Sequence, residues 1–302
     1  MGNVLITGLT GRSGKHFGDL LVRGGHCEAI ALVRSADKFQ RMYPNQQILS
    51  CVEGDTQNEE ALEQIIRNHQ IETIFHISGI KQTPGILNAA LRAGTVRRLV
   101  LVHTTGIYSK FKAASGEYLQ IEADMEQKLR GRGVAVTILR PTMIYGSLDD
   151  HNISVFLRMV DKLRVFPLVK SGRYELQPVN QADLGRAYYQ VLTNPETTAN
   201  RNYNLSGNDV IYLRDMLALM SELLGKKTLF VPVPYWVAYS GAWALYLLSF
   251  TKVDLREKVQ RLVEPRAYSN ADARRDFGYD PMPFREGLAG EVRLYLAEKH
   301  AK

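Results

Sequence analysis

The chain has 302 residues, of which 45% are hydrophobic and 23% charged, with 24 glycines and 11 prolines. These fractions are those of ordinary globular proteins, and they exclude collagen-like, low-complexity and disordered classes. The formal net charge is +7, but the basic residues are scattered and form no long tract, which argues against a nucleic-acid-binding surface.

The two cysteines and the N-terminal residues indicate the cellular compartment of the protein. Cys27 and Cys51 lie in apolar stretches and cannot build a disulfide framework, which is typical of a reducing compartment. The opening MGNVLITG has neither the charged start nor the cleavage site of an export signal. No cluster of His, Cys, Asp and Glu has the spacing of metal ligands. We therefore expect a cytoplasmic protein that holds no metal.

Short apolar runs alternate with helical stretches in the first half of the chain. The runs predict strands buried on both faces of a parallel sheet, at Val4–Thr7, Ala29–Val33, Ile48–Glu53, Thr73–Ile77, Leu99–His103 and Ala135–Leu139. The helices are predicted at Ser13–Arg23, Asn58–Asn68, Pro84–Ala93 and Glu117–Arg130. Three of these four helices are followed by the glycine that commonly ends a helix. This alternation predicts an open, doubly wound α/β sheet.

After about residue 145 the alternation weakens. We predict helices at Val155–Leu163, Gln181–Leu192 and Leu213–Leu224, with short strands at Gln177–Val179 and Arg201–Leu205. No linker rich in Pro, Gly or Ser separates the two halves. We therefore expect residues 1–165 to form the sheet domain. Residues 166–302 are expected to form a smaller mixed α/β substrate-binding region, interleaved with the first and packed on the carboxyl edge of the sheet.

A glycine-rich turn, TGLTGRSG at residues 7–14, follows the first predicted strand and opens a helix. Gly8 permits the tight turn, Gly11 lets the backbone approach a pyrophosphate, and Gly14 allows close packing of helix and strand. The free N–H groups of the helix N-terminus attract the anion. The strand before the turn and the helix after it predict a dinucleotide site, to which Thr10, Arg12 and Ser13 also contribute.

The end of the second strand bears on the choice between NAD and NADP. Sites that prefer NAD place an acidic residue there, which binds the ribose 2′-hydroxyl. This chain instead has Arg34, and a guanidinium suits a 2′-phosphate. We expect Arg12 to lie on the other side of the same phosphate. The two arginines together favour NADP(H) over NAD.

The remaining cofactor candidates follow the third, fourth and sixth strands. We expect Asp55 to accept a hydrogen bond from the adenine amino group, and small residues at the end of the fourth strand to let the backbone run beside the cofactor. We expect the residues after Arg140 to border the nicotinamide and the substrate. The candidates at these strand ends are Asp55, Thr56, Ser78, Gly79, Pro141 and Thr142.

These motifs together resemble the short-chain dehydrogenase/reductase superfamily, and most of all its extended and atypical members: NAD(P)-dependent epimerases/dehydratases and NmrA-like proteins. The resemblance covers nearly the whole chain. Besides TGLTGRSG and EGD it rests on RRLVLVHTTGIY (97–108), ILRPTMIYG (138–146), QPVNQADLGRAYY (177–189), YNLSGND (203–209) and FGYDPMPFREGL (277–288). It implies a Rossmann sheet, an NADP cofactor and a small-molecule substrate. The last motif is similar to the C-terminal signature of nucleotide-sugar epimerases, which suggests a nucleotide sugar, with Arg173 and Arg186 as phosphate partners.

The resemblance also implies a catalytic set: a Ser or Thr after the fifth strand, and a Tyr and a Lys separated by three residues. Thr104 and Thr105 match the first position, and Tyr118 matches the tyrosine, with Tyr108 as a second phenol. The lysine position, however, holds Glu122.

The carboxylate of Glu122 should raise the pKa of a neighbouring phenol, whereas an ammonium would lower it. Three alternatives follow. Another cation compensates, with Lys81, Lys110 and Lys112 as candidates; Glu122 is itself the acid or base; or the usual chemistry has been lost.

An uncharged segment, Leu229–Phe250, raises a separate question. Pro232 and Pro234 leave Tyr235–Phe250 as the helix, about 24 Å long at 1.5 Å per residue and shorter than a hydrocarbon core of about 30 Å. The resemblance favours an apolar helix that packs over the substrate mouth. The alternative is an interfacial helix, rich in Trp and Tyr, that contacts a membrane surface.

The sequence thus predicts an NADP(H)-dependent oxidoreductase or epimerase/dehydratase-like enzyme that acts on a carbinol or ketone carbon. The alternative is a non-catalytic NADP(H)-binding redox sensor or an assembly or regulatory protein, which the missing lysine favours. Substrate identity and oligomeric state lie outside what the sequence indicates.

Overall fold

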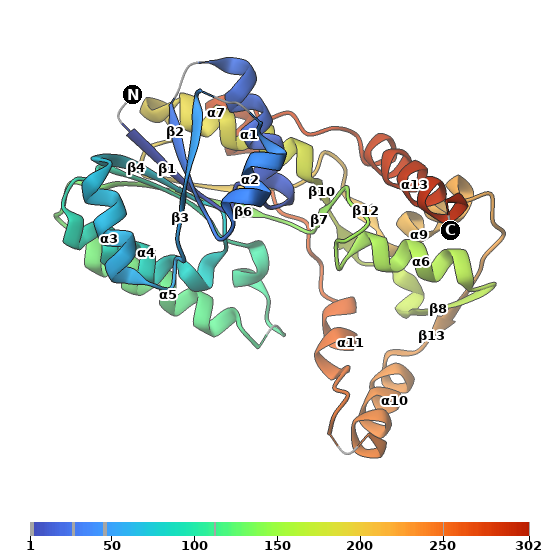
Figure 1. The fold of residues 1–302 in the computed structure, drawn as a ribbon. Helices are drawn as coiled ribbons and strands as arrows, with labels where there is room; N and C mark the ends of the chain where they lie inside the picture. The colour runs from blue at the N-terminus through green and yellow to red at the C-terminus, as the bar shows by residue number, and fades with distance from the viewer. Residues whose placement is uncertain (1–2, 26–27, 45–46, 112, 250, 302) are drawn as a thin grey trace.

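The computed structural model describes residues 3–25, 28–44, 47–111, 113–249 and 251–301, so that Cys27 and Lys112 lie outside the described residues. Seven parallel strands form the central sheet in the order β11-β6-β5-β4-β1-β2-β3 (Figure 1). The strands are β1 (Asn3–Thr7), β2 (Ala29–Val33), β3 (Leu49–Glu53), β4 (Ile71–His76), β5 (Arg98–Val102), β6 (Ala135–Pro141) and β11 (Arg201–Leu205). The doubly wound α/β architecture expected from the sequence is confirmed.

Helices cover both faces of this sheet, which explains why its central strands are largely apolar. Successive side chains of a strand point to opposite faces. Val4 and Ile6 accordingly join one core with Phe17 and Tyr188, whereas Leu5 joins the other with Leu62. The helices of this half are α1 (Arg12–Gly24), α2 (Ala36–Met42), α3 (Glu59–Asn68), α4 (Thr83–Ala93), α5 (Ser115–Leu129), α7 (Gln181–Thr193) and α8 (Pro195–Thr198).

The second half is smaller and is built around its own core, which joins α6, α9 and α13. Three two-stranded sheets lie outside the central sheet: β7 with β10, β9 with β12, and β8 with β13. The helices of the second half are α6 (Ile153–Lys162), α9 (Leu213–Leu223), α10 (Tyr235–Leu248), α11 (Arg256–Leu262) and α13 (Phe284–His300). The helix α12 (Ala271–Phe277) belongs instead to the first half, where Ala273 and Phe277 are buried in the core beside β11. The strands of the second half are β7 (Ile144–Tyr145), β8 (Val165–Val169), β9 (Glu175–Leu176), β10 (Val179–Asn180), β12 (Ile211–Tyr212) and β13 (Leu229–Val233). The halves are interleaved along the chain, because α6 belongs to the second and β11 to the first.

Two local predictions differ from the structure. The strand expected at Gln177–Val179 is wrong: β9 ends at Leu176 and β10 begins at Val179, with Gln177 and Pro178 between them. Gln177 is instead held by its side chain, which donates to the carbonyl of Gly207 at 2.8 Å. The sequence analysis also missed α2, whose N-cap is Ser35: its hydroxyl accepts from the backbone N–H of Lys38 at 3.2 Å.

A third difference concerns α10. We call the segment 235–263, which contains α10 and α11, the arm; it projects away from both halves (Figure 1). The preferred expectation of a helix packed over the substrate mouth is wrong, since Ala242 is the one residue of α10 that is buried. None of the helices among the described residues has both the length and the apolar character that crossing a bilayer requires.

Candidate cofactor and substrate site

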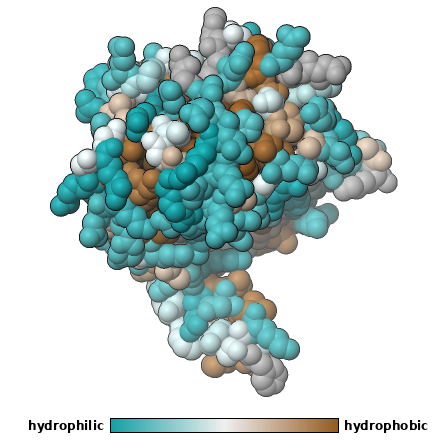
Figure 2. All heavy atoms as spheres, turned by 60° about the vertical axis from the view of Figure 1, so that its left-hand side comes forward, coloured by the Kyte–Doolittle hydropathy of each residue, from teal (hydrophilic) through white to brown (hydrophobic). Residues whose placement is uncertain are grey.

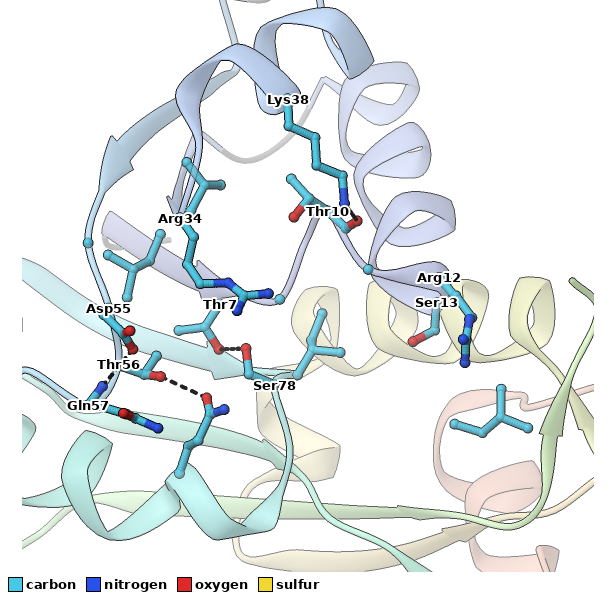
Figure 3. Close-up of a pocket in the computed structure, with 18 of the residues that line it drawn as sticks. Thr7, Thr10, Arg12, Ser13, Arg34, Lys38, Asp55, Thr56, Gln57 and Ser78 are labelled. Carbon is cyan, nitrogen blue, oxygen red and sulfur yellow. Dashed lines mark hydrogen bonds between the residues drawn. The ribbon is translucent and has the colours of Figure 1, made fainter. Parts of the chain in front are cut away.

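A cleft of about 760 Å³ opens at the carboxyl ends of β1, β2, β3 and β4, beside the N-terminus of α1 (Figure 3). Parallel α/β sheets bind ligands at this edge. Of the predicted cofactor residues, ten line it: Gly8, Thr10, Gly11, Arg12, Ser13, Arg34, Asp55, Thr56, Ser78 and Thr142. Gly14, Gly79 and Pro141 are not among its lining residues.

The geometry of the glycine turn suits an anion. Gly8 has φ +78°, a conformation that residues with a side chain rarely adopt. A Cβ on Gly14 would lie 2.3 Å from the carbonyl oxygen of Gly8, so this glycine lets α1 pack directly on the turn. No side chain caps α1, whose N-cap is Gly11. The first N–H groups of the helix therefore face the cleft, where a pyrophosphate would satisfy them.

Two cations flank the end of the cleft next to β2. Arg34 follows β2 directly, and Lys38 reaches back from α2 so that its ammonium lies 3.2 Å from the carbonyl oxygen of Thr10 (Figure 3). Asp55 lies below Arg34 and accepts from the backbone N–H of Gln57 at 2.9 Å. Sequence reasoning missed Lys38, although the preceding Ser35 is of a residue type that commonly caps a helix and so was a usable signal.

Arg12 does not lie beside Arg34. The two side chains are on opposite sides of the cleft, and Arg12 is turned toward the loop after β7 (Figure 3). There its Nε lies 3.0 Å from a carboxylate oxygen of Asp149. This ion pair bridges one end of the cleft. The two arginines therefore do not lie side by side in the structure, and the second cation on the Arg34 side of the cleft is Lys38.

A buried chain of hydrogen bonds supports the floor of the cleft. Ser78 donates to the hydroxyl of Thr7 at 3.3 Å, which in turn lies 2.7 Å from Nδ1 of His76. Nε2 of His76 lies 3.0 Å from the carbonyl of Gly79, which can only accept, so Nε2 carries the proton and Nδ1 accepts. Burial lowers the pKa of His76 to about 4, which keeps the ring neutral. His76 is thus a structural residue of β4.

A second cleft, of about 260 Å³, adjoins the first, and both are lined by Thr142 and Asn152. Thr104 and Thr105 line it at the end of β5. The hydroxyl of Thr105 donates to the carbonyl of Pro141 at 3.1 Å. Thr104 accepts from the backbone N–H of Gly106 at 3.0 Å, an arrangement that leaves its own proton for a ligand oxygen.

Two arginines that sequence reasoning did not select also line the second cleft: Arg261 from α11, and Arg266 beyond it. Among the residues that the structure describes, the buried Nε atoms of both have no hydrogen-bond partner. Burial, reinforced by the nearby Arg261, lowers the pKa of Arg266 to about 10. A buried guanidinium with an unused N–H is costly unless an anion meets it. Arg173 and Arg186, which the sequence analysis gave as phosphate partners of the substrate, line neither cleft.

Glu122 occupies a buried network and lines neither cleft. Its carboxylate accepts from Nε and Nη2 of Arg140 and lies 2.8 Å from Nδ1 of His103. Burial alone would raise the pKa of Glu122, but the hydrogen bonds from His103 and Arg140 outweigh it, and the net pKa is lowered. Burial lowers the pKa of His103 despite the nearby carboxylate. The cation that pairs with the Glu122 carboxylate is thus the guanidinium of Arg140.

Nor do the two predicted tyrosines line either cleft. Tyr118 is buried with Ile80 and Ile107. Tyr108 is exposed, and its ring centre lies 5.2 Å from that of Tyr268. Tyr268 is the phenol that does line the second cleft, and burial raises its pKa.

The two described lysines that were proposed to compensate, Lys81 and Lys110, both lie on the surface. The ammonium of Lys81 pairs with Glu117 at 2.7 Å on the surface. Lys110 is exposed, and its backbone N–H donates to Glu264 at 2.7 Å. Neither lysine lines the second cleft.

Comparison with known proteins agrees with this geometry. Residues 8–195 match the family model described as NAD(P)H-binding, and the chain belongs to that family. Its fold is that of the epimerases and dehydratases of the extended short-chain dehydrogenase/reductase superfamily, as the sequence motifs predicted.

Two solved structures show the likeness in fold. UDP-glucose 4-epimerase from Thermotoga maritima, solved with UDP-glucose, has a TM-score of 0.71 at 19% identity, over 98% of this chain and 99% of that one. The dTDP-glucose 4,6-dehydratase from Bacillus anthracis, solved in complex with NAD, has a TM-score of 0.74 at 17% identity, over 99% and 98%.

Three curated relatives match over different shares of the chain. A 2-alkyl-3-oxoalkanoate reductase from Stenotrophomonas maltophilia is 24% identical over 94% of this chain and 97% of its own. The mitochondrial NADH dehydrogenase [ubiquinone] 1 alpha subcomplex subunit 9 of Arabidopsis thaliana is 24% identical over 41% of this chain and 31% of its own. UDP-glucose 4-epimerase from Klebsiella pneumoniae is 32% identical over 26% and 59%. The match therefore spans less than two thirds of the last two relatives.

Proposed function

We propose that this protein is an NADP(H)-dependent oxidoreductase that acts on a carbonyl or carbinol carbon of an anionic small molecule. The observation that carries the proposal is the junction of the two clefts at Thr142 and Asn152. The first cleft, which suits a dinucleotide, here meets a second cleft lined by two arginines. The Nε atoms of these arginines have no hydrogen-bond partner among the residues that the structure describes.

The preference for NADP(H) is supported by Arg34 and Lys38. No carboxylate follows β2 directly, where the sequence is Val33-Arg34-Ser35. A 2′-phosphate between a guanidinium and an ammonium makes charge-assisted hydrogen bonds that a ribose hydroxyl cannot match. Each such bond contributes about 1.5–3 kcal/mol.

In the second cleft the chain supplies proton donors and positive charge. When bound, the nicotinamide exchanges a hydride with the substrate carbon. The hydroxyl of Thr104 donates a hydrogen bond to the oxygen on that carbon, and the phenol of Tyr268, kept protonated by its raised pKa, is the second donor. Arg261 and Arg266 neutralise the anionic group of the substrate. This arrangement replaces the Tyr-Lys pair of the wider family.

The names of the relatives are consistent with an anionic substrate. An oxoalkanoate carries a carboxylate beside a ketone, and UDP-glucose carries a diphosphate. We therefore propose a phosphate, diphosphate or carboxylate group for the substrate, with a nucleotide sugar as one member of that class.

The test measures oxidation of NADPH with ketones that carry a phosphate or carboxylate, against neutral ketones of the same size. We expect turnover of anionic ketones, and a KM that rises about tenfold or more in Arg266→Met, from the loss of one charged hydrogen bond. Arg173→Met, an exposed arginine that lines neither cleft, is the matched control. Equal turnover of neutral ketones would refute the anionic class. NADPH binding without turnover of any ketone would favour the non-catalytic sensor or assembly protein.

A further inference from the structure

The arm carries an apolar helix that the rest of the protein leaves uncovered. Six large hydrophobic side chains of α10 are at least 40% exposed: Trp236 70%, Val237 40%, Trp243 40%, Leu245 40%, Leu247 63% and Leu248 79%. Figure 2 shows the arm as a narrow lobe below the main body, with hydrophobic residues on its surface. A helix of this kind in a soluble protein normally buries its apolar face.

The exposed apolar residues of α10 surround the helix. Leu245 follows Trp236 by nine residues, about two and a half turns, and so lies on the opposite side of the helix. Trp236 and Trp243, seven residues apart, share a side. A single packing partner along one face would therefore leave other apolar side chains in water, whereas a surrounding apolar medium would cover them all.

The length of α10 limits what that medium can be. Its 14 residues extend about 21 Å, too short for a hydrocarbon core of about 30 Å. An apolar segment of 10–14 residues is typically a buried core helix or an interfacial segment. The exposure of α10 excludes the first.

Charge and aromatic content indicate the surface that the arm contacts. The uncharged stretch 228–251 lies between Lys226-Lys227 and Lys252. Lys252, Arg256 and Lys258 follow, with Asp254 and Glu257 among them, and Arg256 pairs with Asp254 at 2.7 Å. The guanidinium carbon of Arg256 lies 4.3 Å and 3.9 Å from the ring centres of Trp243 and Tyr246, which places a cation at the aromatic belt of the arm. Trp and Tyr gather at the membrane–water interface, and basic residues beside them bind anionic headgroups.

An apolar cavity of about 340 Å³ lies at the root of the arm. Phe156, Pro167 and Val233 contribute to its lining, together with Ala238 from α10 and Leu262 from α11. This cavity has apolar walls, which suit a lipid acyl chain that the arm displaces from the leaflet. A second copy of this chain is a poorer occupant, because each copy has a formal charge of +7 and the two repel.

We propose that the α10–α11 arm inserts into one leaflet of a bilayer that contains anionic lipids. Trp236, Trp243 and the leucines at the end of α10 enter the apolar layer, and the flanking basic side chains meet the headgroups. The proposal concerns where the protein is held, and it stands independently of the reaction proposed above.

Flotation of the whole chain with vesicles tests the arm. The vesicles are phosphatidylcholine alone, or phosphatidylcholine with 30% phosphatidylglycerol. We expect the protein to float with the anionic vesicles, less so with the neutral ones, and with a blue shift in tryptophan emission. The double variant Leu247→Glu with Leu248→Glu should bind at least tenfold more weakly. Leu294→Glu on α13, where Leu294 is 54% exposed, is the matched control and should float like the wild type.

The affinity for NADPH, measured in parallel, checks that each variant is folded. Absence of flotation by the wild type, or flotation of the double variant equal to that of the wild type, would overturn the proposal. So would a dimer in lipid-free light scattering that the double variant dissociates, because a second copy would then be the occupant of α10.

Discussion

Restoring the family lysine at position 122 should destabilise this protein instead of restoring the usual chemistry. The carboxylate of Glu122 is 14% exposed, and the Arg140 and His103 side chains it binds are 9% and 0% exposed. Removing one partner of a buried pair typically costs about 3–5 kcal/mol, since the other charge stays buried and unpaired. Glu122→Lys also sets an ammonium beside a guanidinium, so we expect a loss of at least about 4 kcal/mol in the free energy of unfolding.

For a chain of this size each kcal/mol lowers Tm by about 2–4 °C, so Glu122→Lys should unfold at least about 8 °C below the wild type. Differential scanning calorimetry measures this shift. Glu126→Lys, an exposed change one turn along the same helix, is the matched control and should alter stability by no more than about 0.5 kcal/mol. A Tm for Glu122→Lys within 2 °C of the wild type would show that the network with Arg140 and His103 is not what holds α5 to the sheet.

Three further predictions concern the cofactor turn, its selectivity and a buried carboxylate. Gly14→Ala should weaken NADPH binding and cost about 1–3 kcal/mol of stability, because its Cβ would lie 2.3 Å from the carbonyl oxygen of Gly8; unchanged binding in calorimetry would contradict this. Arg34→Asp should lower the ratio of NADPH to NADH affinity at least tenfold, whereas Arg41→Asp, exposed on α2 and outside the cleft, should leave it unchanged in fluorescence titrations. Burial, together with the charge of Asp150, raises the pKa of Glu291 to about 8 from an ordinary value of 4.5, so its folded form holds a proton that the unfolded chain has lost. Wild-type stability should therefore fall, relative to Glu291→Gln, as pH rises from about 4.5 to 8; a constant difference in urea unfolding across that range would refute the assignment.

Much of the first half could be predicted because its signals are local. The turn from Gly8 to Gly14 has its strand, glycines and helix within a short stretch, and β2 lies at Ala29–Val33 as the apolar run indicates. Lys38 was missed because α2 is short and is marked mainly by its Ser35 cap, which hydrophobic periodicity does not reveal.

The residues that could not be predicted depend on contacts between distant parts of the chain. Nothing near Glu122 in the sequence shows that Arg140 and His103 surround it, since both approach from neighbouring strands. Arg261, at the end of the arm, and Arg266, just beyond it, reach the second cleft although they lie more than 150 residues after Thr104. The apolar run at 235–248 is the same whether its helix is covered or exposed, so composition favoured burial and the structure shows the opposite.

The sharing of Thr142 and Asn152 by the two clefts has a kinetic consequence. A dinucleotide in the first cleft becomes part of the wall of the second, so the second is complete only once the first is filled. We therefore expect compulsory order, with the coenzyme bound first and released last. A dead-end inhibitor of the second cleft should then be uncompetitive against NADPH.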